Sequence, residues 1–358
     1  MSKYTNPLHQ AAEMFPMTQL WNDSCGVGDI EFALARGGCG ATSNPVIVGN
    51  VLRKEIGLWE ERLNKIISEE YPSATDEEIC WIISREAGLK GAQLLRPLFE
   101  ETKGQKGWQA LQVNPRFYRD RARTVAHAAQ LAGDEPNVLI KMPVSTAGVE
   151  ALEECVYKGV SVNGTVCFGI PQAVAVAEAI EQGLKRREAE NLPIDGLSVS
   201  CTIMTGRVGD YMRSLAEARG VEIDPVWADM GGVAIFKKAY RIFRERGYRA
   251  KLLAANNNSH YLWSHLLGGD IYMTVNPVWW RELEGREMEL RATIDEPVDE
   301  IIVDTLLDKF PEYGMIYRED GLMVREFNDY GAFKNTMSEF LTGYDAFIAY
   351  LRGFIMPR

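Results

Sequence analysis

The sequence predicts an α/β fold, namely a (β/α)8 barrel with additional helices that include one at the C-terminus. Short apolar runs alternate repeatedly with longer amphipathic stretches, which is typical of a parallel sheet with helical crossovers. Eight such runs occur, and eight strands close a barrel better than they fill an open sheet. The length of 358 residues suits one barrel with insertions. We therefore expect residues 1–358 to form a single barrel domain.

The amino-terminal part contains two short strands and a long helical region. The run TQLWND has the apolar character of a strand, and DIEFALAR that of a short helix with Asp29 as its N-cap. After a second strand, two long stretches carry Glu, Lys, Leu and Ile at helical spacing. We interpret residues 46–103 as a helical insertion in the barrel. The predicted elements here are strands 18–23 and 39–43 and helices 29–36, 46–71 and 76–103.

Strands and helices alternate more tightly after residue 103. Each short run rich in Val, Ile, Leu and Cys precedes a stretch of helical periodicity. The C-terminal segment, 330–353, is helical in pattern and rich in Phe, Tyr and Leu. The remaining predicted strands are 108–113, 137–142, 160–166, 196–202, 249–255 and 270–275, and the helices are 118–132, 147–158, 171–187, 208–219 and 232–246.

The composition excludes several classes of protein. Hydrophobic residues make up 46% and charged residues 25%, a globular balance that excludes disorder and collagen-like structure. The net charge of -11 argues against nucleic acid or an anionic membrane surface as a partner. No apolar run is long enough for a signal peptide or a membrane span. We expect a soluble, cytoplasmic protein, either monomeric or a homo-oligomer.

Cysteine and histidine usage disfavours a metal site. The six cysteines are scattered, with no CxxC pair and no neighbouring histidine, which favours free thiols in a reducing compartment. No P-loop, GxSxG, HExxH or metal-ligand cluster occurs. The four histidines are also scattered. We therefore expect neither a metal nor an organic cofactor.

Active sites of (β/α)8 barrels lie at the C-terminal ends of the strands, so polar residues there are candidates for chemistry. Asn163 and Thr165 are two residues apart and hence share one face of their strand. Asn44 precedes Pro45, which is by itself only a turn signal. The polar residues at the predicted strand ends are Asp23, Asn44, Gln112, Lys141, Asn163, Thr165, Thr202, Arg207, Asn256 and Asn258.

Lys141 is the most informative of these residues. It lies in the otherwise apolar run VLIKMP, where alternation places it on the same face as Leu139. A lysine inside a barrel has a lowered pKa, and its free amine can attack a carbonyl as a Schiff-base lysine does. The alternative is a lysine that extends to solvent or pairs with a structural carboxylate, and this segment alone favours neither. Asp23 could face Lys141 across the barrel mouth, or be a loop or N-cap aspartate.

Five segments, in order along the chain, resemble motifs of the transaldolase family. The third contains Lys141 at the position of the Schiff-base lysine. The match extends from about Asp23 to Asn258. The segments are TSNPVI (42–47), LQVNPR (111–116), NVLIKMP (137–143), GVSVNGTVCF (159–168) and Gly206-Arg207 followed by Asp210-Tyr211.

The resemblance implies a role for each matched residue. Lys141 would form a Schiff base with a ketose, and Asp23 would be the acid/base for the hydroxyl at the bond that is cleaved. Thr165 would hold a catalytic water with Gln112, and Arg207 would contact the sugar-phosphate end. Asn44, Asn163 and Thr202 would bind the dihydroxyacetone unit. Asn256 and Asn258, at the end of the seventh strand, are further candidates for substrate binding.

Three positions depart from the family pattern. Gln112 replaces the glutamate of transaldolases, as in the fructose-6-phosphate aldolase branch, but that branch has a tyrosine where this chain has Met204. The seventh strand has residues 255–258 (ANNN) where the family has a serine and an arginine for phosphate. The sequence therefore predicts a preference for a substrate whose far end is not a standard sugar phosphate.

The resemblance implies a transferase of carbohydrate metabolism, of the pentose phosphate type, that moves a dihydroxyacetone unit from a ketose to an aldehyde. The alternatives are an aldolase of the fructose-6-phosphate type that releases dihydroxyacetone, or an enzyme of either kind acting on a sulfonated sugar. A different class is an inactive sugar-binding barrel. A binding protein has no need of an enclosed lysine near a carboxylate, which favours the enzyme.

Overall fold

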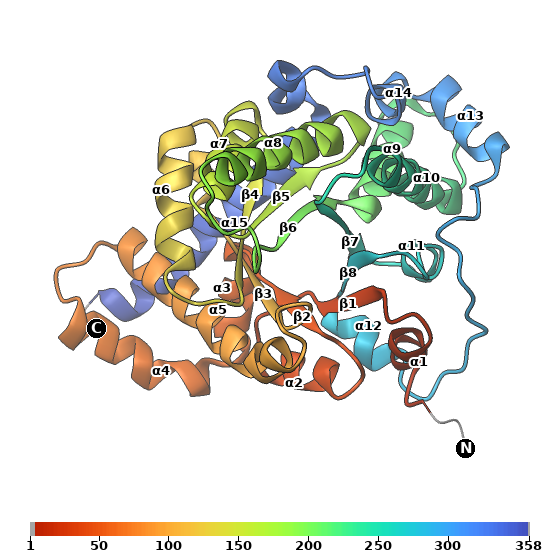
Figure 1. The fold of residues 1–358 in the computed structure, drawn as a ribbon. Helices are drawn as coiled ribbons and strands as arrows, with labels where there is room; N and C mark the ends of the chain where they lie inside the picture. Colours follow the sequence, from red (N-terminus) through yellow and green to blue (C-terminus); the bar gives the residue numbers. More distant parts are fainter. Residues whose placement is uncertain (1–3, 357–358) are drawn as a thin grey trace.

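The computed structural model describes residues 4–356, and its strands form a closed barrel (Figure 1). All eight strands are parallel and pair in chain order, and β8 pairs with β1 to close the sheet. The predicted (β/α)8 barrel is confirmed. The strands are β1 (Thr18–Asn22), β2 (Gly40–Thr42), β3 (Trp108–Gln112), β4 (Val138–Pro143), β5 (Val162–Cys167), β6 (Val199–Ile203), β7 (Lys251–Asn257) and β8 (Ile271–Val275).

Helices surround the barrel on all sides (Figure 1). Those in the first half are α1 (Pro7–Met14), α2 (Val27–Leu34), α3 (Pro45–Lys54), α4 (Ile56–Lys65), the π-helical turn η1 (Ile66–Glu70), α5 (Asp76–Glu101), the 3-10 turn η2 (Pro115–Phe117), α6 (Arg121–Ala132) and α7 (Thr146–Tyr157). Those in the second half are α8 (Ile170–Ala189), α9 (Thr205–Arg219), α10 (Pro225–Arg246), α11 (His260–Ser264), α12 (Pro277–Glu282), α13 (Glu300–Lys309), α14 (Pro311–Tyr317), the 3-10 turn η3 (Val324–Asp329) and α15 (Gly331–Ile355).

Two details of the predicted amino-terminal helices are corrected. The segment 46–71 is not one helix, because the backbone leaves the helical region at Glu55. Gly57, a poor helix former, follows this break. Asp29 is not an N-cap: α2 begins after Gly26, and the buried Asp29 carboxylate pairs with Lys54 and Arg281.

Helix α10 is longer than its sequence pattern predicts. It begins at Pro225, with Asp224 as N-cap, whereas the prediction began at Gly232. The Gly231-Gly232 pair resembles a helix break in the sequence, but it serves close packing. A Cβ at position 232 would overlap the carbonyl oxygen of Thr205, so glycine lets α10 approach the start of α9. The short helices α1 and α11–α14 were not predicted, since so few turns give little periodicity.

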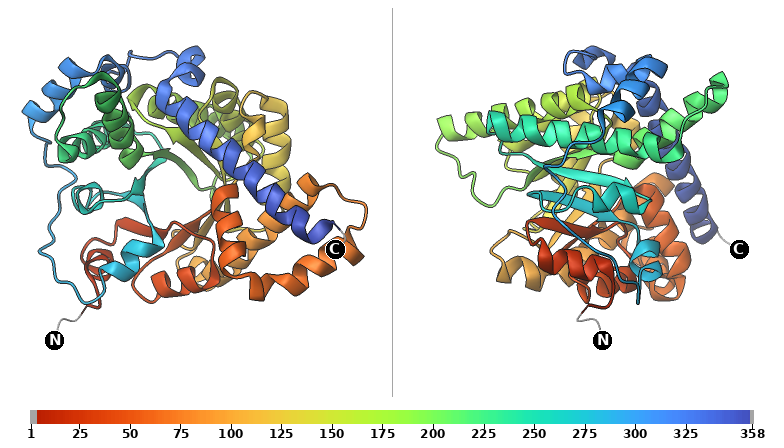
Figure 2. Two further views of the ribbon diagram at one scale, coloured as in Figure 1. Left: turned by 180° about the vertical axis from the view of Figure 1, so that it is seen from behind. Right: turned by 90° about the vertical axis from the view of Figure 1, so that its right-hand side faces the viewer.

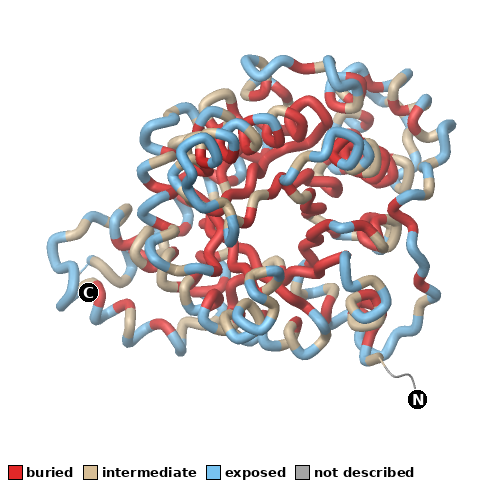
Figure 3. Tube along the Cα trace, in the orientation of Figure 1, coloured by how far each residue is buried: buried red, intermediate tan, exposed pale blue. Residues whose placement is uncertain are grey.

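Large apolar side chains fill the amino-terminal part of the barrel interior. Trp21 and Tyr272 pack with ring centroids 4.6 Å apart, near Trp108 and Leu139. A Cβ on Gly40 would lie 2.6 Å from the indole of Trp21, which explains the glycine there. The burial map shows the strands as the buried centre of the molecule (Figure 3). The polar cavity described below lies at the opposite, carboxyl-terminal end.

Helix α15 crosses the outside of the barrel at this carboxyl-terminal end (Figure 2). Its residues Tyr344, Phe347 and Leu351 join a buried cluster with Val48 of α3 and Trp59 of α4. The last helix of the chain is thus packed against the first helices after β2. Within residues 4–356, none of the helices combines the length and the apolar character that crossing a membrane requires.

Candidate active site

A polar cavity of about 80 Å³ lies at the carboxyl-terminal ends of the strands. It is well below the roughly 300–1,000 Å³ of pockets for drug-sized ligands, so it suits a short polar substrate. All eight strands or the loops that follow them contribute to its lining. The lining residues are Asp23, Thr42, Asn44, Ala110, Lys141, Asn163, Thr165, Thr202, Met204, Arg207, Leu253, Ala255, Asn256, Thr274 and Phe340.

Lys141 lies in the middle of this lining, on the inward face of β4. Its register neighbours are Gln112 on β3 and Asn163 on β5. The Nζ atom donates a hydrogen bond to Thr42 Oγ1 at 2.9 Å and is 3.4 Å from the carbonyl oxygen of Ser43. Enclosure in the barrel lowers the pKa of Lys141 from 10.5 to about 8, although the charge of Asp23 opposes this shift. The neutral amine is therefore far more abundant near physiological pH than in an ordinary lysine, although the ammonium form still predominates.

Asp23 follows β1 directly and lines the same cavity. Its backbone N–H donates to the carbonyl oxygen of Val275, which extends the pairing of β1 with β8. Burial raises the pKa of the Asp23 carboxyl above its usual value, while the charges of Lys141 and Arg207 act in the opposite direction. A carboxylate and an amine whose pKa values approach each other are suited to proton transfer near neutral pH.

Asn163 and Thr202 hold each other in place on β5 and β6. Thr202 Oγ1 donates to Asn163 Oδ1 at 2.7 Å, and Asn163 Nδ2 donates to Ser200 Oγ at 2.8 Å. All three side chains are buried. Asn44 is fixed differently, because its Oδ1 accepts from the N–H of Ile47 and caps α3. These bonds orient the polar wall before any substrate is bound.

Two irregular strand ends shape the site. The β5–β6 register shifts between Gly164 and Cys167, and Val166 has a φ of 56°. A β-branched residue is strained in this left-handed region, so the bulge directly follows Thr165 at a backbone cost. Asn256 has a φ of 60° in the corresponding irregularity of β7. Bulges of this kind often redirect side chains beside active sites.

The structure brings eight of the ten sequence-predicted site residues to the cavity, namely Asp23, Asn44, Lys141, Asn163, Thr165, Thr202, Arg207 and Asn256. Gln112 lies beside it, in a smaller cavity that shares Asn44 and includes Ser84. Gln112 is buried, and within residues 4–356 neither of its amide atoms has a hydrogen-bond partner. Asn258 is exposed and outside the lining.

Several lining residues had no signal in the sequence. Thr42 accepts a hydrogen bond from Lys141, whereas the sequence indicated only Asn44 as a site residue in this segment. Phe340 reaches the cavity from α15, and Glu339 beside it forms an ion pair with Arg207 at 2.7 Å. Nothing in the local pattern of a C-terminal amphipathic helix marks a position that faces a site built by distant strands.

The arrangement is suited to carbonyl chemistry by an amine nucleophile. It combines an enclosed lysine, a carboxylate and an amide–hydroxyl wall on a rigid barrel. No three His, Cys, Asp or Glu side chains in the described part of the chain come together as metal ligands.

Comparison with known proteins agrees with this geometry. The family described as Transaldolase/Fructose-6-phosphate aldolase matches residues 20–312. Transaldolase 2 of Streptomyces avermitilis is 28% identical over 231 residues, which cover 63% of this chain and 61% of the relative. The transaldolase of Thiobacillus denitrificans is 30% identical over 233 residues, 60% of each chain. The aligned region thus spans about three fifths of these relatives. Because the family match covers most of the barrel, the chain belongs to the transaldolase/fructose-6-phosphate aldolase family.

Proposed function

We propose that this protein transfers a dihydroxyacetone unit from a ketose to an aldehyde through a Schiff base at Lys141. The observation that carries the proposal is the lysine itself. It is enclosed in a polar cavity beside Asp23, and its pKa is lowered to about 8. Family membership supports the same chemistry.

The proposed reaction has two halves. The neutral amine of Lys141 attacks the ketose carbonyl carbon, and loss of water leaves an iminium ion. Asp23 takes the proton of the hydroxyl at C4, the C3–C4 bond breaks, and its electron pair enters the iminium to form an enamine. The aldehyde leaves. The enamine carbon then attacks an acceptor aldehyde, and hydrolysis of the resulting iminium frees the lysine.

The wall residues have supporting roles in this proposal. The amides of Asn44 and Asn163 and the hydroxyl of Thr202 bind the dihydroxyacetone hydroxyls, and Thr165 holds the water for hydrolysis. Asn256 and Arg207 face the far end of the substrate, and Asn258 would contribute only from the rim. The proposed enzyme is cytoplasmic and needs no metal or organic cofactor. It acts on small sugars rather than on nucleic acid or a membrane, as a monomer or a homo-oligomer.

The second candidate is an aldolase that releases dihydroxyacetone. The specific feature in its favour is Gln112, an amide next to Lys141 in register where transaldolases have a carboxylate. In this variant the enamine is protonated and hydrolysed instead of attacking an acceptor. Product analysis with and without an added aldehyde separates the two reactions.

Borohydride trapping tests the proposal. Purified protein is incubated with fructose, fructose 6-phosphate or dihydroxyacetone, reduced, digested and mapped by mass spectrometry. We expect a dihydroxyacetone remnant on Lys141, and none in Lys141→Ala. Lys237 is the internal control, because burial also lowers its pKa to about 8, but it lies on α10, outside the cavity. Labelling of Lys237 alone, or no adduct with any ketose, would contradict the mechanism and favour an inactive sugar-binding barrel.

A further inference from the structure

We propose that Glu339 on α15 determines specificity: it neutralises Arg207, so that the site accepts a substrate whose far end carries uncharged hydroxyl groups rather than a phosphate. This inference rests on the proposed function and names its substrate class. It depends on a residue outside the barrel strands, which the family match to residues 20–312 does not include.

Charge balance at the cavity is the first step. Of the described residues that line it, Lys141 and Arg207 are the two cations. Lys141 is committed to the reacting carbonyl and lies near Asp23. Arg207 Nη1 donates to Glu339 Oε2 at 2.7 Å and lies 3.5 Å from Thr336 Oγ1. Glu339 is 57% exposed and Arg207 24% exposed, so the pair lies at the rim of the cavity, where an incoming dianion would meet a cation that already has a carboxylate partner.

The hydrogen-bonding groups left over are suited to hydroxyls. Arg207 Nε is buried and has no partner within residues 4–356, although the guanidinium as a whole is held by α15. Thr274 also lines the cavity, and its Oγ1 is likewise buried without a hydrogen-bond partner among the described residues. Buried polar atoms without partners are costly. One sugar hydroxyl can accept from Arg207 Nε and another can donate to Thr274 Oγ1, and neither brings charge near Glu339.

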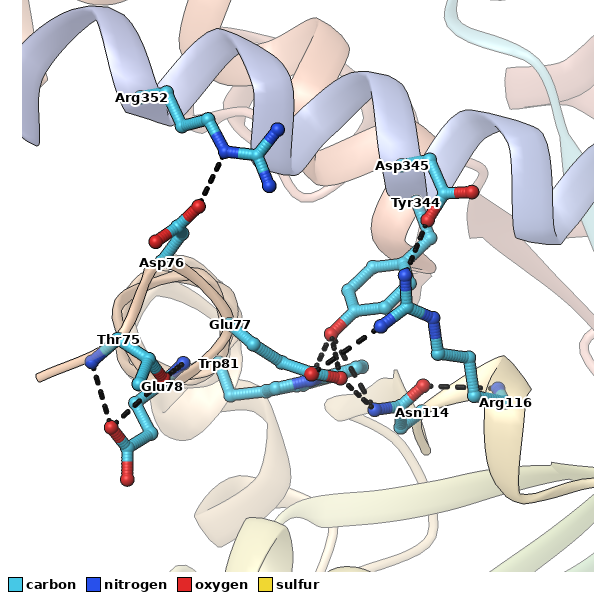
Figure 4. Close-up of polar contacts among 10 residues, drawn as sticks. All are labelled: Thr75, Asp76, Glu77, Glu78, Trp81, Asn114, Arg116, Tyr344, Asp345 and Arg352. Carbon is cyan, nitrogen blue, oxygen red and sulfur yellow. Dashed lines mark hydrogen bonds and ion pairs between the residues drawn. The ribbon is translucent and has the colours of Figure 1, made fainter.

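The third step is that α15 cannot easily carry Glu339 away. Phe340 and Tyr344 are one turn apart on α15, so they share a helix face. Phe340 lines the cavity, and Tyr344 is anchored to α5 (Figure 4). Tyr344 Oη donates to Glu77 Oε1 and accepts from Trp81 Nε1, each at 2.8 Å.

Asn114 extends this anchor to the barrel. Its Nδ2 donates to Glu77 Oε1 at 3.0 Å, and Asn114 follows β3 (Figure 4). Exposed ion pairs of Arg116 with Asp345 and of Arg352 with Asp76 lie around the cluster and add little. These partly buried bonds fix the helix that presents Glu339, and the ion pair with Arg207 forms without rearrangement.

Inorganic phosphate is the direct probe, measured by isothermal titration on the purified full chain. We expect Glu339→Gln to bind phosphate at least about tenfold more tightly than the wild type, because the substitution frees Arg207. Glu339→Ala should behave alike. Adding Arg207→Gln to Glu339→Gln should abolish the gain. Asp345→Asn is the matched control: it removes one negative charge from the same helix away from Arg207, and its affinity should stay within about twofold of the wild type.

A turnover measurement complements the titration. We expect the ratio of kcat/KM for glyceraldehyde 3-phosphate over glyceraldehyde to rise about tenfold in Glu339→Gln, mainly through KM. Equal phosphate affinity in wild type and Glu339→Gln would overturn the inference, as would the same gain in Asp345→Asn. Either of these outcomes would leave borohydride trapping at Lys141 unaffected. Absence of trapping would instead refute the proposed function and would not change the phosphate measurement. The two failures are thus distinguishable.

Discussion

At the scale of single residues, the cavity sets the protonation of Lys141 and Asp23 jointly. Burial lowers the pKa of Lys141 and raises that of Asp23, while the attraction between ammonium and carboxylate opposes both shifts. The charge of each group therefore shifts the pKa of the other. Their protonation predicts how the rate of Schiff-base formation depends on pH.

The rate of adduct formation should rise with pH and level off above about 8. The ammonium form of Lys141 predominates below its pKa and cannot attack a carbonyl, whereas the free amine predominates above it. The measurement is the initial rate of borohydride-trapped adduct on Lys141 with dihydroxyacetone across the pH range. A midpoint near 10.5, the ordinary lysine value, would show that the amine is fully solvated.

Asp23→Asn should slow carbon–carbon bond cleavage by about 10²–10⁴-fold while trapping at Lys141 continues. The amide cannot accept the hydroxyl proton. The substitution also removes the negative charge of Asp23, which raises the pKa of Lys141, so the midpoint of adduct formation should move to lower pH. Cleavage is followed as release of the aldehyde from a ketose.

Asp195→Asn is the matched control for this variant. Asp195 is exposed between α8 and β6 and lies outside the cavity lining. Its cleavage rate should stay close to that of the wild type. Wild-type cleavage by Asp23→Asn would remove Asp23 from the proposed mechanism.

At the scale of elements, α15 and α5 depend on each other through one partly buried cluster. Tyr344 lies between Trp81 and Glu77, and all three groups are bonded through its hydroxyl. Burial, together with the bond to Glu77, raises the pKa of the Tyr344 phenol, so it remains a neutral donor. The cluster joins helices more than 200 residues apart in the chain.

Tyr344→Phe should reduce the free energy of unfolding by about 1–3 kcal/mol, because it leaves Trp81 Nε1 without its acceptor and removes one of the donors to Glu77. Urea unfolding monitored by tryptophan fluorescence measures the change. Tyr350→Phe, on the same helix but outside the cluster, should have little effect. Equal stability of both variants would mean that water replaces the lost bonds.

At the scale of the whole molecule, the two ends of the chain share a core. Phe347 of α15 is fully buried in a cluster with Val48 and Leu63 of the amino-terminal half. β1 also pairs with β8, so neither half has a complete sheet. We therefore expect the predicted single domain, with residues 46–103 as a part of it, to unfold as one unit.

Phe347→Ala should lower the free energy of unfolding by about 3–5 kcal/mol through the cavity that it creates. Far-UV circular dichroism and fluorescence should give superimposable urea curves in the wild type, and the variant should shift both equally. Ile301→Ala, at a side chain that is 63% exposed, should change stability by no more than about 0.5 kcal/mol. A shift in only one signal would show that the helical region unfolds separately.

The sequence by itself determined the barrel and eight of the fifteen residues that line the cavity. Period-2 alternation in VLIKMP placed Lys141 on the same face as Leu139, and the structure has Leu139 in the barrel interior and Lys141 in the cavity. Such positions are predictable because strand geometry is local and the strand ends of a barrel converge at one place. The roles of these residues remain predictions.

Only the tertiary structure decided which distant groups meet at the site. The bend at Glu55, the continuous α10 through Gly231-Gly232 and the contacts of Glu339 and Phe340 depend on packing between elements far apart in the chain. Local patterns contain no information about such contacts. Arg207 shows the difference most clearly: the sequence places a cation after the sixth strand, but its charge is available or neutralised according to a helix about 130 residues later, and only folding brings the two together.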